Sequence, residues 1–351
     1  MTIHNLLGFL IPLAVLGLIA MLTYLYYRNR VLKLMKKLDH IAGHIPPLRM
    51  KLKEIHKDKS HKYCAAEKKI IAELESLSFQ KLGLFKIEET AHSRLHAFSS
   101  PDESTYAVLI KCPQEKSRLK FYCTDDKGKI FIAHSADDPG LDHPDFTQFT
   151  YFNYQLDQTE PVAAPMWESV QQVSHRQKLA PIAFKKNFNR LYQREMNWRI
   201  NRHGLSRKEV LHLAECSGYA VPTNEEIELI QEHWHIAISE TIREDVRNSY
   251  RQRHGEEIWE KTAKGFFVIH NQRNKALLLE GLGIRLSKAG FKGKERNEFL
   301  QSLEEKFKTS SIMDVCAEEL DKLSEQFEIK RLENIDKPWP ALCYYIPKKS
   351  L

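Results

Sequence analysis

The sequence lacks the short motifs that identify most common enzyme classes. It contains no GxSxG nucleophile elbow, no HExxH zinc motif and no GxxxxGK[ST] phosphate-binding loop. It also shows no repeat period and no low-complexity tract, which argues against a repeat protein. We therefore assign no catalytic, metal-binding or cofactor-binding residue from the sequence. Enzyme activity stays undecided, and a noncatalytic role is favoured.

Closely spaced cysteines are also missing. The six cysteines are Cys64, Cys112, Cys123, Cys216, Cys316 and Cys343. They are scattered, without a CxxC pair or a dense framework, as is typical of reduced thiols. Cys123 falls in an expected strand beside Tyr122, which favours a small core residue over a reactive thiolate.

Charge is absent from residues 1–27 and concentrated in residues 28–62. This second stretch holds eleven Lys and Arg against three acidic residues, a net charge of +8. Because the whole chain carries +7, the other residues sum to −1 (7 − 8). The turn near Ala214–Gly218 resembles that of a helix-turn-helix, but Glu225, Glu226 and Glu228 follow it and would face phosphates. We therefore expect no nucleic-acid partner.

The uncharged run Leu6–Tyr27 is 22 residues long. As a helix it would extend roughly 33 Å, enough for a hydrocarbon core of about 30 Å, so residues 1–27 are predicted to be a transmembrane anchor. A cleaved signal peptide and a hydrophobic hairpin in a soluble core are the alternatives. The absence of a basic residue in "MTIHN" and the bulky tyrosines at the end of the run disfavour the signal peptide.

Basic residues flank this run on its C-terminal side. Because positive flanks stay in the cytoplasm, the sequence predicts a single-pass protein of the inner membrane, with the N-terminus outside and the C-terminal body cytoplasmic. The residues expected at the membrane interface are Tyr24, Tyr26, Tyr27, Arg28, Arg30, Lys33, Lys36 and Lys37.

Residues 28–77 are expected to form a basic juxtamembrane helical linker. Apolar residues recur every three or four positions over 31–55, a pattern shared with coiled coils. Gly43 and the proline pair 46–47 interrupt it, which favours two short amphipathic helices over a continuous coiled coil. Their lysines would contact anionic lipid headgroups.

Residues 78–160 are predicted to form a small antiparallel sheet. "TYAVLIKC" reads as a strand, and "SRLKFYCTDDKGKIFIAHS" reads as a hairpin with its turn at Asp126–Gly128. A polar loop, "DDPGLDHPDF", follows at 137–146. Residues 161–351 show helical periodicity and end in the tail "DKPWPALCYYIPKKSL". The predicted fold class is thus α+β, with an N-terminal transmembrane helix, juxtamembrane helices, a small antiparallel sheet and a mainly helical C-terminal region.

Asp142 and His143 in "LDHP" are the best polar candidates for a site, because they could pair at a loop mouth. The alternative is an Asx-type turn ahead of Pro144. His233 and His235 are two residues apart and would point about 200° apart on a helix, so they are not expected to share a metal.

The stretches "STYAVLI", "LDHP" and "MNWRINRHGLSRKEV" resemble an uncharacterised group of bacterial proteins. These proteins pair a single membrane segment with a small strand-rich unit and a helical cytoplasmic region. The resemblance covers about residues 75–215 and implies this architecture without an activity.

Together these features favour an interaction or scaffolding module at the inner face of the membrane, with a protein partner, a second copy or anionic lipid as its contacts. The alternative is a membrane-tethered enzyme or small-ligand sensor with a pocket between sheet and helices. An enzyme should bring several ionisable groups with shifted pKa values together in a pocket. A scaffold should expose an apolar or aromatic patch, for which Trp339, Tyr344 and Tyr345 are candidates.

Overall fold

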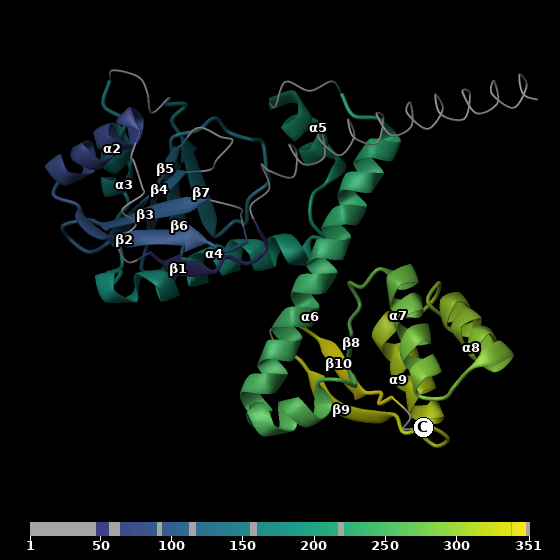
Figure 1. The fold of residues 1–351 in the computed structure, drawn as a ribbon. Helices are drawn as coiled ribbons and strands as arrows, with labels where there is room; N and C mark the ends of the chain where they lie inside the picture. The colour runs from purple at the N-terminus through teal and green to yellow at the C-terminus, as the bar shows by residue number, and fades with distance from the viewer. Residues whose placement is uncertain are drawn as a thin grey trace, which may run out of the picture.

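Two sheets lie on either side of a long helix (Figure 1). The computed structural model describes residues 47–55, 64–89, 93–111, 117–154, 160–216, 221–337 and 339–348. Within these ranges the larger sheet and the smaller sheet each carry helices on both faces, and α6 (Asn224–Thr262) runs between the two lobes.

The larger sheet has seven strands in the order β1-β2-β3-β4-β5-β6-β7. Neighbouring strands are antiparallel except β6 and β7, which are parallel. The strands are β1 (Leu52–Glu54), β2 (Gln80–Ile87), β3 (Arg94–Ser99), β4 (Thr105–Lys111), β5 (Arg118–Thr124), β6 (Ile130–His134) and β7 (Thr147–Tyr151).

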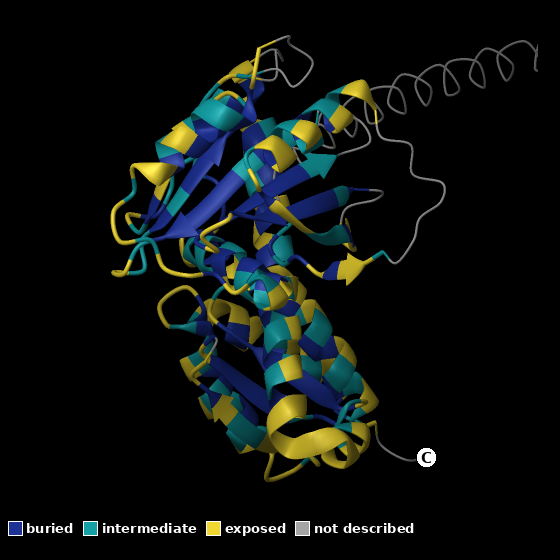
Figure 2. Ribbon diagram, turned by 90° about the vertical axis from the view of Figure 1, so that its left-hand side faces the viewer, coloured by how far each residue is buried: buried dark blue, intermediate teal, exposed yellow. Residues whose placement is uncertain are grey.

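Helices α2 (Ala65–Ser76) and α3 (Ala163–Gln171) cover one face of this sheet, and α4 (Phe184–Asn201) covers the other. Successive residues of a strand point to opposite faces, so the central strands need apolar side chains at nearly every position. Phe121 of β5 packs under α2 and α3, whereas its neighbour Tyr122 packs against α4. Figure 2 shows these strands as buried.

The long helix α6 joins the two lobes through one continuous apolar cluster. Its buried residues include Trp234, which packs with residues of α4, and Tyr250, which packs with Phe266 of the smaller sheet. Thr223 caps the helix, accepting the backbone N–H of Glu226. Gly255 interrupts the helical geometry with φ +81, and the chain turns there. Helix α5 (Arg207–Cys216) precedes α6 and contacts it.

The smaller sheet consists of β8 (Phe266–Ile269), β9 (Lys330–Ile335) and β10 (Ala341–Tyr345), in the antiparallel order β8-β10-β9. Helices α7 (Lys275–Lys288), α8 (Gly293–Lys306) and α9 (Ile312–Leu323) pack on one face, and α6 packs on the other. The alternation is again visible, because Cys343 faces α6 while Tyr344 faces α7 to α9.

The described chain is α+β, but the predicted architecture needs correction. The larger sheet exceeds the small sheet expected for 78–160, and a second sheet lies in the region predicted to be mainly helical. Part of the segment expected to form a juxtamembrane helix is extended instead, because β1 pairs with β2. In the same segment, Arg49 donates to the carboxylate of Asp245 on α6. The coiled-coil alternative concerns residues that lie mostly outside the described ranges.

The predicted transmembrane architecture is contradicted as well. In the part of the chain that the structure describes, no helix combines the length and apolar character needed to cross a membrane. The longest, α6, has exposed charged residues along one face. This finding overturns the single-pass location. The predicted anchor, residues 1–27, and its interface residues 24–37 lie outside the described residues.

Candidate functional site

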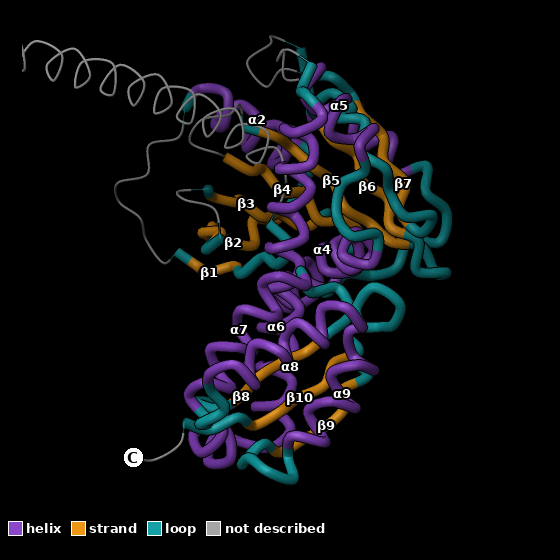
Figure 3. The backbone as a smooth tube through the Cα atoms, turned by 90° about the vertical axis from the view of Figure 1, so that its right-hand side faces the viewer, coloured by secondary structure: helices purple, strands orange, loops and turns teal. Residues whose placement is uncertain are grey.

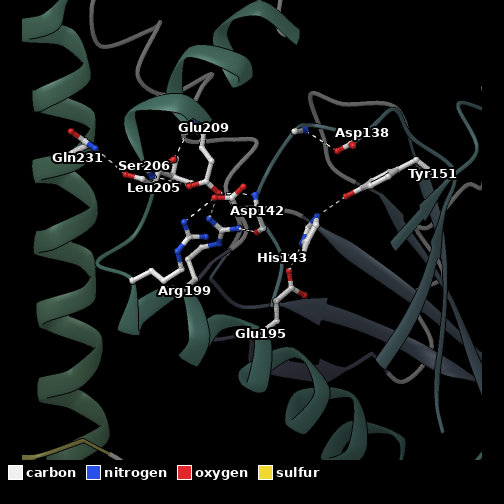
Figure 4. Close-up of polar contacts among 12 residues, drawn as sticks. Asp138, Asp142, His143, Tyr151, Glu195, Arg199, Leu205, Ser206, Glu209 and Gln231 are labelled. Atoms are coloured by element: carbon white, nitrogen blue, oxygen red, sulfur yellow. Dashed lines mark hydrogen bonds and ion pairs between the residues drawn. The ribbon is translucent and has the colours of Figure 1, made fainter. Parts of the chain in front are cut away.

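Asp142 and His143 lie on the loop between β6 and β7, facing α4 and α5 (Figure 4). They do not pair with each other. The backbone N–H of Asp142 donates to Glu209 Oε1 at 2.9 Å, and its carbonyl accepts from Arg199 Nη2 at 2.8 Å. Its half-exposed carboxylate accepts from Arg202 Nη2 at 2.8 Å. This hydrogen bond from Arg202 is the main reason why the pKa of Asp142 is lowered.

His143 points away from Asp142, toward β7. Its ring stacks on Phe149 with centroids 3.8 Å apart, and Nε2 lies 3.0 Å from the Tyr151 hydroxyl. Nδ1 lies 3.6 Å from Glu195 Oε1 on α4. Burial, followed by the charges of Asp138 and Glu195, raises the pKa of Tyr151. The phenol therefore keeps its proton at neutral pH and can donate it to a His143 tautomer with a free Nε2.

Arg199 and Glu209 form a buried ion pair behind this loop. Arg199 Nη1 donates to Glu209 Oε1 at 2.9 Å, and the two side chains are 3% and 1% exposed. The other carboxylate oxygen accepts the backbone N–H of Ser206 at 2.8 Å, while Ser206 Oγ accepts the N–H of Glu209. Burial opposes ionisation of Glu209, but the hydrogen bonds from Ser206 and Arg199 outweigh it, and the net pKa is lowered.

A close backbone contact fixes the same loop against α5. Gly140 has φ +64, and a Cβ at this position would lie 1.8 Å from the ring of His212. Only glycine fits there without movement of the histidine. The polar groups of Asp142, Arg199 and Glu209 find their partners within this cluster and in Arg202 and Ser206, and the cluster joins the β6–β7 loop to α4 and α5. Its geometry supports a structural role.

A separate pocket lies on the opposite face of the sheet, between α3, β6 and β7. We call it the α3–β7 pocket; its volume is about 580 Å³. It exists because α3 packs over β5 and β6 but leaves the face of β7 uncovered. Gln148 and Thr150 of β7 point into it, whereas the alternate residues Phe149 and Tyr151 point toward His143.

The lining of the α3–β7 pocket is mostly uncharged. Its apolar residues are Phe131, Ile132, Ala133, Val170 and Val173, and its neutral polar residues are Gln148, Thr150, Ser169, Gln172 and Ser174. Asp125 is the ionisable residue among them, and its Oδ1 accepts the backbone N–H of Lys129 at 2.8 Å. The Lys129 ammonium donates to Gln148 and lies 5.3 Å from the Phe131 ring centroid.

The structure also shows where the other residues considered in the sequence analysis lie. Cys123 is fully buried, and burial raises its pKa to about 12, so its thiol stays protonated. His233 and His235 are both exposed, on either side of the buried Trp234. No metal-binding group of His, Cys, Asp or Glu occurs in the described ranges. Trp339 and Tyr344 are buried and Tyr345 is half-buried, so these three residues do not form the exposed aromatic patch expected for a scaffold.

The sequence analysis missed the ion pair and the residues of the pocket, although one of its alternatives included a pocket between sheet and helices. The Ser206–Glu209 spacing is a local capping-box signal that could have identified one half of the ion pair. The pocket had no local signal, because β6, β7 and α3 meet only in the folded chain.

Comparisons with known proteins give no information about the site. No protein-family model, curated protein or solved structure matches the chain. The resemblance to bacterial membrane proteins therefore stays a prediction.

Proposed function

We propose that the chain is a noncatalytic binding protein that holds a small, uncharged polar ligand in the α3–β7 pocket. The observation that carries this proposal is a pocket of about 580 Å³ whose lining combines apolar residues with hydroxyl and amide side chains. Small-molecule sites fall in the range of roughly 300–1,000 Å³ and combine apolar walls with a few polar groups. This is the small-ligand form of the alternatives given above.

The lining indicates the class of ligand. Hydroxyls and amides both donate and accept hydrogen bonds, which suits a polyhydroxylated or amide-bearing molecule. The apolar lining residues, such as Phe131, would pack against its C–H groups. A strongly charged ligand fits this lining less well, because Asp125 is the one ionisable residue among the described residues that line the pocket, and the other lining residues are neutral.

The ionisable groups also favour binding over catalysis. General acid–base chemistry needs a positioned pair of titratable groups within reach of the substrate. Asp125 stands without such a partner among the described residues that line the pocket. Asp142 and His143 lie on the other face of β7, so they cannot supply one.

Ligand-observed NMR on the full chain tests the proposal with a panel of sugars, polyols and amides, and with carboxylates and amines of similar size. We expect neutral compounds to bind and Ser169→Phe, which places a ring inside the pocket, to weaken them at least tenfold, or about 1.4 kcal/mol. Glu168→Phe puts the same ring on the exposed side of α3 and should leave binding unchanged. Preferential binding of charged compounds, no binding at all, or equal loss in both variants would contradict the proposal.

A further inference from the structure

A second, chemically different pocket lies in the smaller lobe, between α6, α7 and the edge strand β8. Its volume is about 250 Å³, and we call it the arginine pocket. Four arginines line it: Arg243, Arg247, Arg273 and Arg285. Among the described residues that line this pocket, none is acidic. Four cations around a space of this size create a strong local attraction for anions.

Three parts of the chain bring the arginines together. Arg243 and Arg247 are four residues apart on α6 and therefore share one face of that helix. Arg273 follows β8 in the turn before α7, and Arg285 lies in the last turn of α7. Figure 3 shows α7 beside α6 in the lobe that contains β8. The guanidinium groups thus reach one space from different directions.

Arg273 is the most buried of the four, at 9% exposure. Its Nη1 donates to the neutral carbonyl of Val268 at 2.9 Å, and its guanidinium lies 4.9 Å from the Phe267 ring centroid. Gly281 lets the guanidinium approach α7, because a Cβ there would lie 3.1 Å from Nη2. Burial, followed by the charge of Arg243, lowers the pKa of Arg273 to about 10, so the group remains cationic at neutral pH.

The neighbouring arginines are only partly compensated. Arg285 Nη1 donates to the carbonyl of Lys264, and Arg247 lies 5.6 Å from the Trp259 ring centroid. Arg243 pairs with Glu240 at 2.6 Å, outside this pocket's lining. Burial, followed by the charges of Arg247 and Arg243, lowers the pKa of Arg285. The positive charges therefore repel one another, and a bound dianion would relieve that repulsion.

We propose that the arginine pocket binds the phosphate group of a small organic phosphate. Guanidinium groups form paired hydrogen bonds with phosphate oxygens, and a tetrahedral dianion accepts such bonds from several directions at once. An adjoining pocket of about 210 Å³ shares Arg243, Arg273, Gly281 and Ile284 and offers space for the organic part. Glu240 and Glu280 also line this adjoining pocket, so its chemistry suits an organic part that donates hydrogen bonds, such as a polyol. Ile284 is 50% exposed and supplies an apolar wall there.

Isothermal titration of the full chain with inorganic phosphate, and then with glycerol 3-phosphate, tests this site. We expect both to bind, glycerol 3-phosphate more tightly, and Arg247→Gln to weaken both at least tenfold. Arg247 is half-buried, so this variant should fold; the more buried Arg273→Met serves as a second variant after its fold is checked by circular dichroism. Arg251→Gln is the matched control on the next turn of α6, where Arg251 pairs with Glu256, and should change binding less than twofold.

The other outcomes overturn the proposal. Absence of phosphate binding, or equal weakening by Arg251→Gln, would show that the arginine pocket is not the site. A single-stranded oligonucleotide that binds more tightly than glycerol 3-phosphate and loses affinity in Arg247→Gln would show a polyanion surface instead. None of these results depends on the α3–β7 pocket, so this proposal and the proposed function can fail separately.

Discussion

Replacing Arg199 by methionine is expected to lower the free energy of unfolding by about 3–5 kcal/mol, the usual effect of removing one partner of a buried ion pair. Glu209 is 1% exposed, and its carboxylate would be left buried without a cation beside it. The Asp142 carbonyl would also lose the hydrogen bond from Arg199. Urea denaturation followed by circular dichroism, with Met chosen to preserve length and helix propensity, measures the change.

Arg202→Met is the matched control for this prediction. Arg202 and Asp142 form an ion pair of similar length, 2.8 Å, but their side chains are 36% and 44% exposed. Water and salt screen such a pair, so we expect a change of less than about 1 kcal/mol. The double variant Arg199→Met/Glu209→Leu should recover part of the lost stability, because it removes the isolated charge but also the acceptor of the Asp142 and Ser206 N–H groups. Equal effects of Arg199→Met and Arg202→Met would show that burial of the pair is unimportant.

The elements that the sequence predicts correctly are those with local signals. The β5–β6 hairpin has alternating apolar residues around a turn at Asp126–Gly128, and β4 is a short β-branched and aromatic run. Helix α4 lies in the region predicted to be helical; it has apolar residues at helical spacing and ends before Gly204, which has a φ of +95. In each case turn or cap chemistry lies within a few residues of the element.

The expected helix over Leu48–Ile55 shows why other predictions are wrong. A spacing of four residues places side chains on one face of a helix, but it does the same in a strand, where every second residue shares a face. Leu48, Met50 and Leu52 are buried alternately, in an extended segment that ends in β1. Pairing with β2 decides between the two structures, and this partner lies far along the chain.

The smaller sheet and the two pockets depend on still longer-range pairing. Strand β8 pairs with β10, and Ile269 of β8 lies opposite Leu342 of β10 in the register. Both strands are short and buried on both faces, so their sequences carry no period that separates them from a buried helix. The arginine pocket forms only after this pairing places Arg273 and Arg285 beside α6. The position of Asp142 in a polar cluster could be predicted, but its partner Arg199 could not.

Mild acid is expected to destabilise the protein through two buried histidines. His134 of β6 is 5% exposed, and its Nε2 makes no hydrogen bond among the described residues. His270 is 1% exposed, with Nε2 3.4 Å from Ser239 Oγ. Burial, followed by the charges of Arg273 and Arg243, lowers the pKa of His270 to about 3. Burial, followed by the charges of Lys120 and Arg118, lowers the pKa of His134 still further.

The direction of the pH effect follows from proton binding. In the unfolded chain both histidines should titrate near pH 6.5, whereas in the folded chain they stay neutral to much lower pH. Below pH 6.5 the unfolded state therefore binds more protons, and stability falls as the pH falls. Each histidine contributes a slope of about 1.4 kcal/mol per pH unit, so the two together should remove about 4 kcal/mol between pH 7.5 and 5.

Measurements between pH 7.5 and 5 distinguish the effect of the histidines on stability from that of the carboxylates. Asp142 and Glu209 have lowered pKa values in the folded chain, so their contribution is present above the unfolded pKa and is lost only as the pH falls below about 4.5. Urea denaturation at half-unit steps from pH 7.5 to 5 should show a slope that decreases by about half in His270→Gln and in His134→Gln. The exposed His233→Gln should keep the wild-type slope. An unchanged slope in both buried variants would mean that these two histidines do not control acid stability, and the acid-sensitive groups would then have to lie elsewhere in the chain.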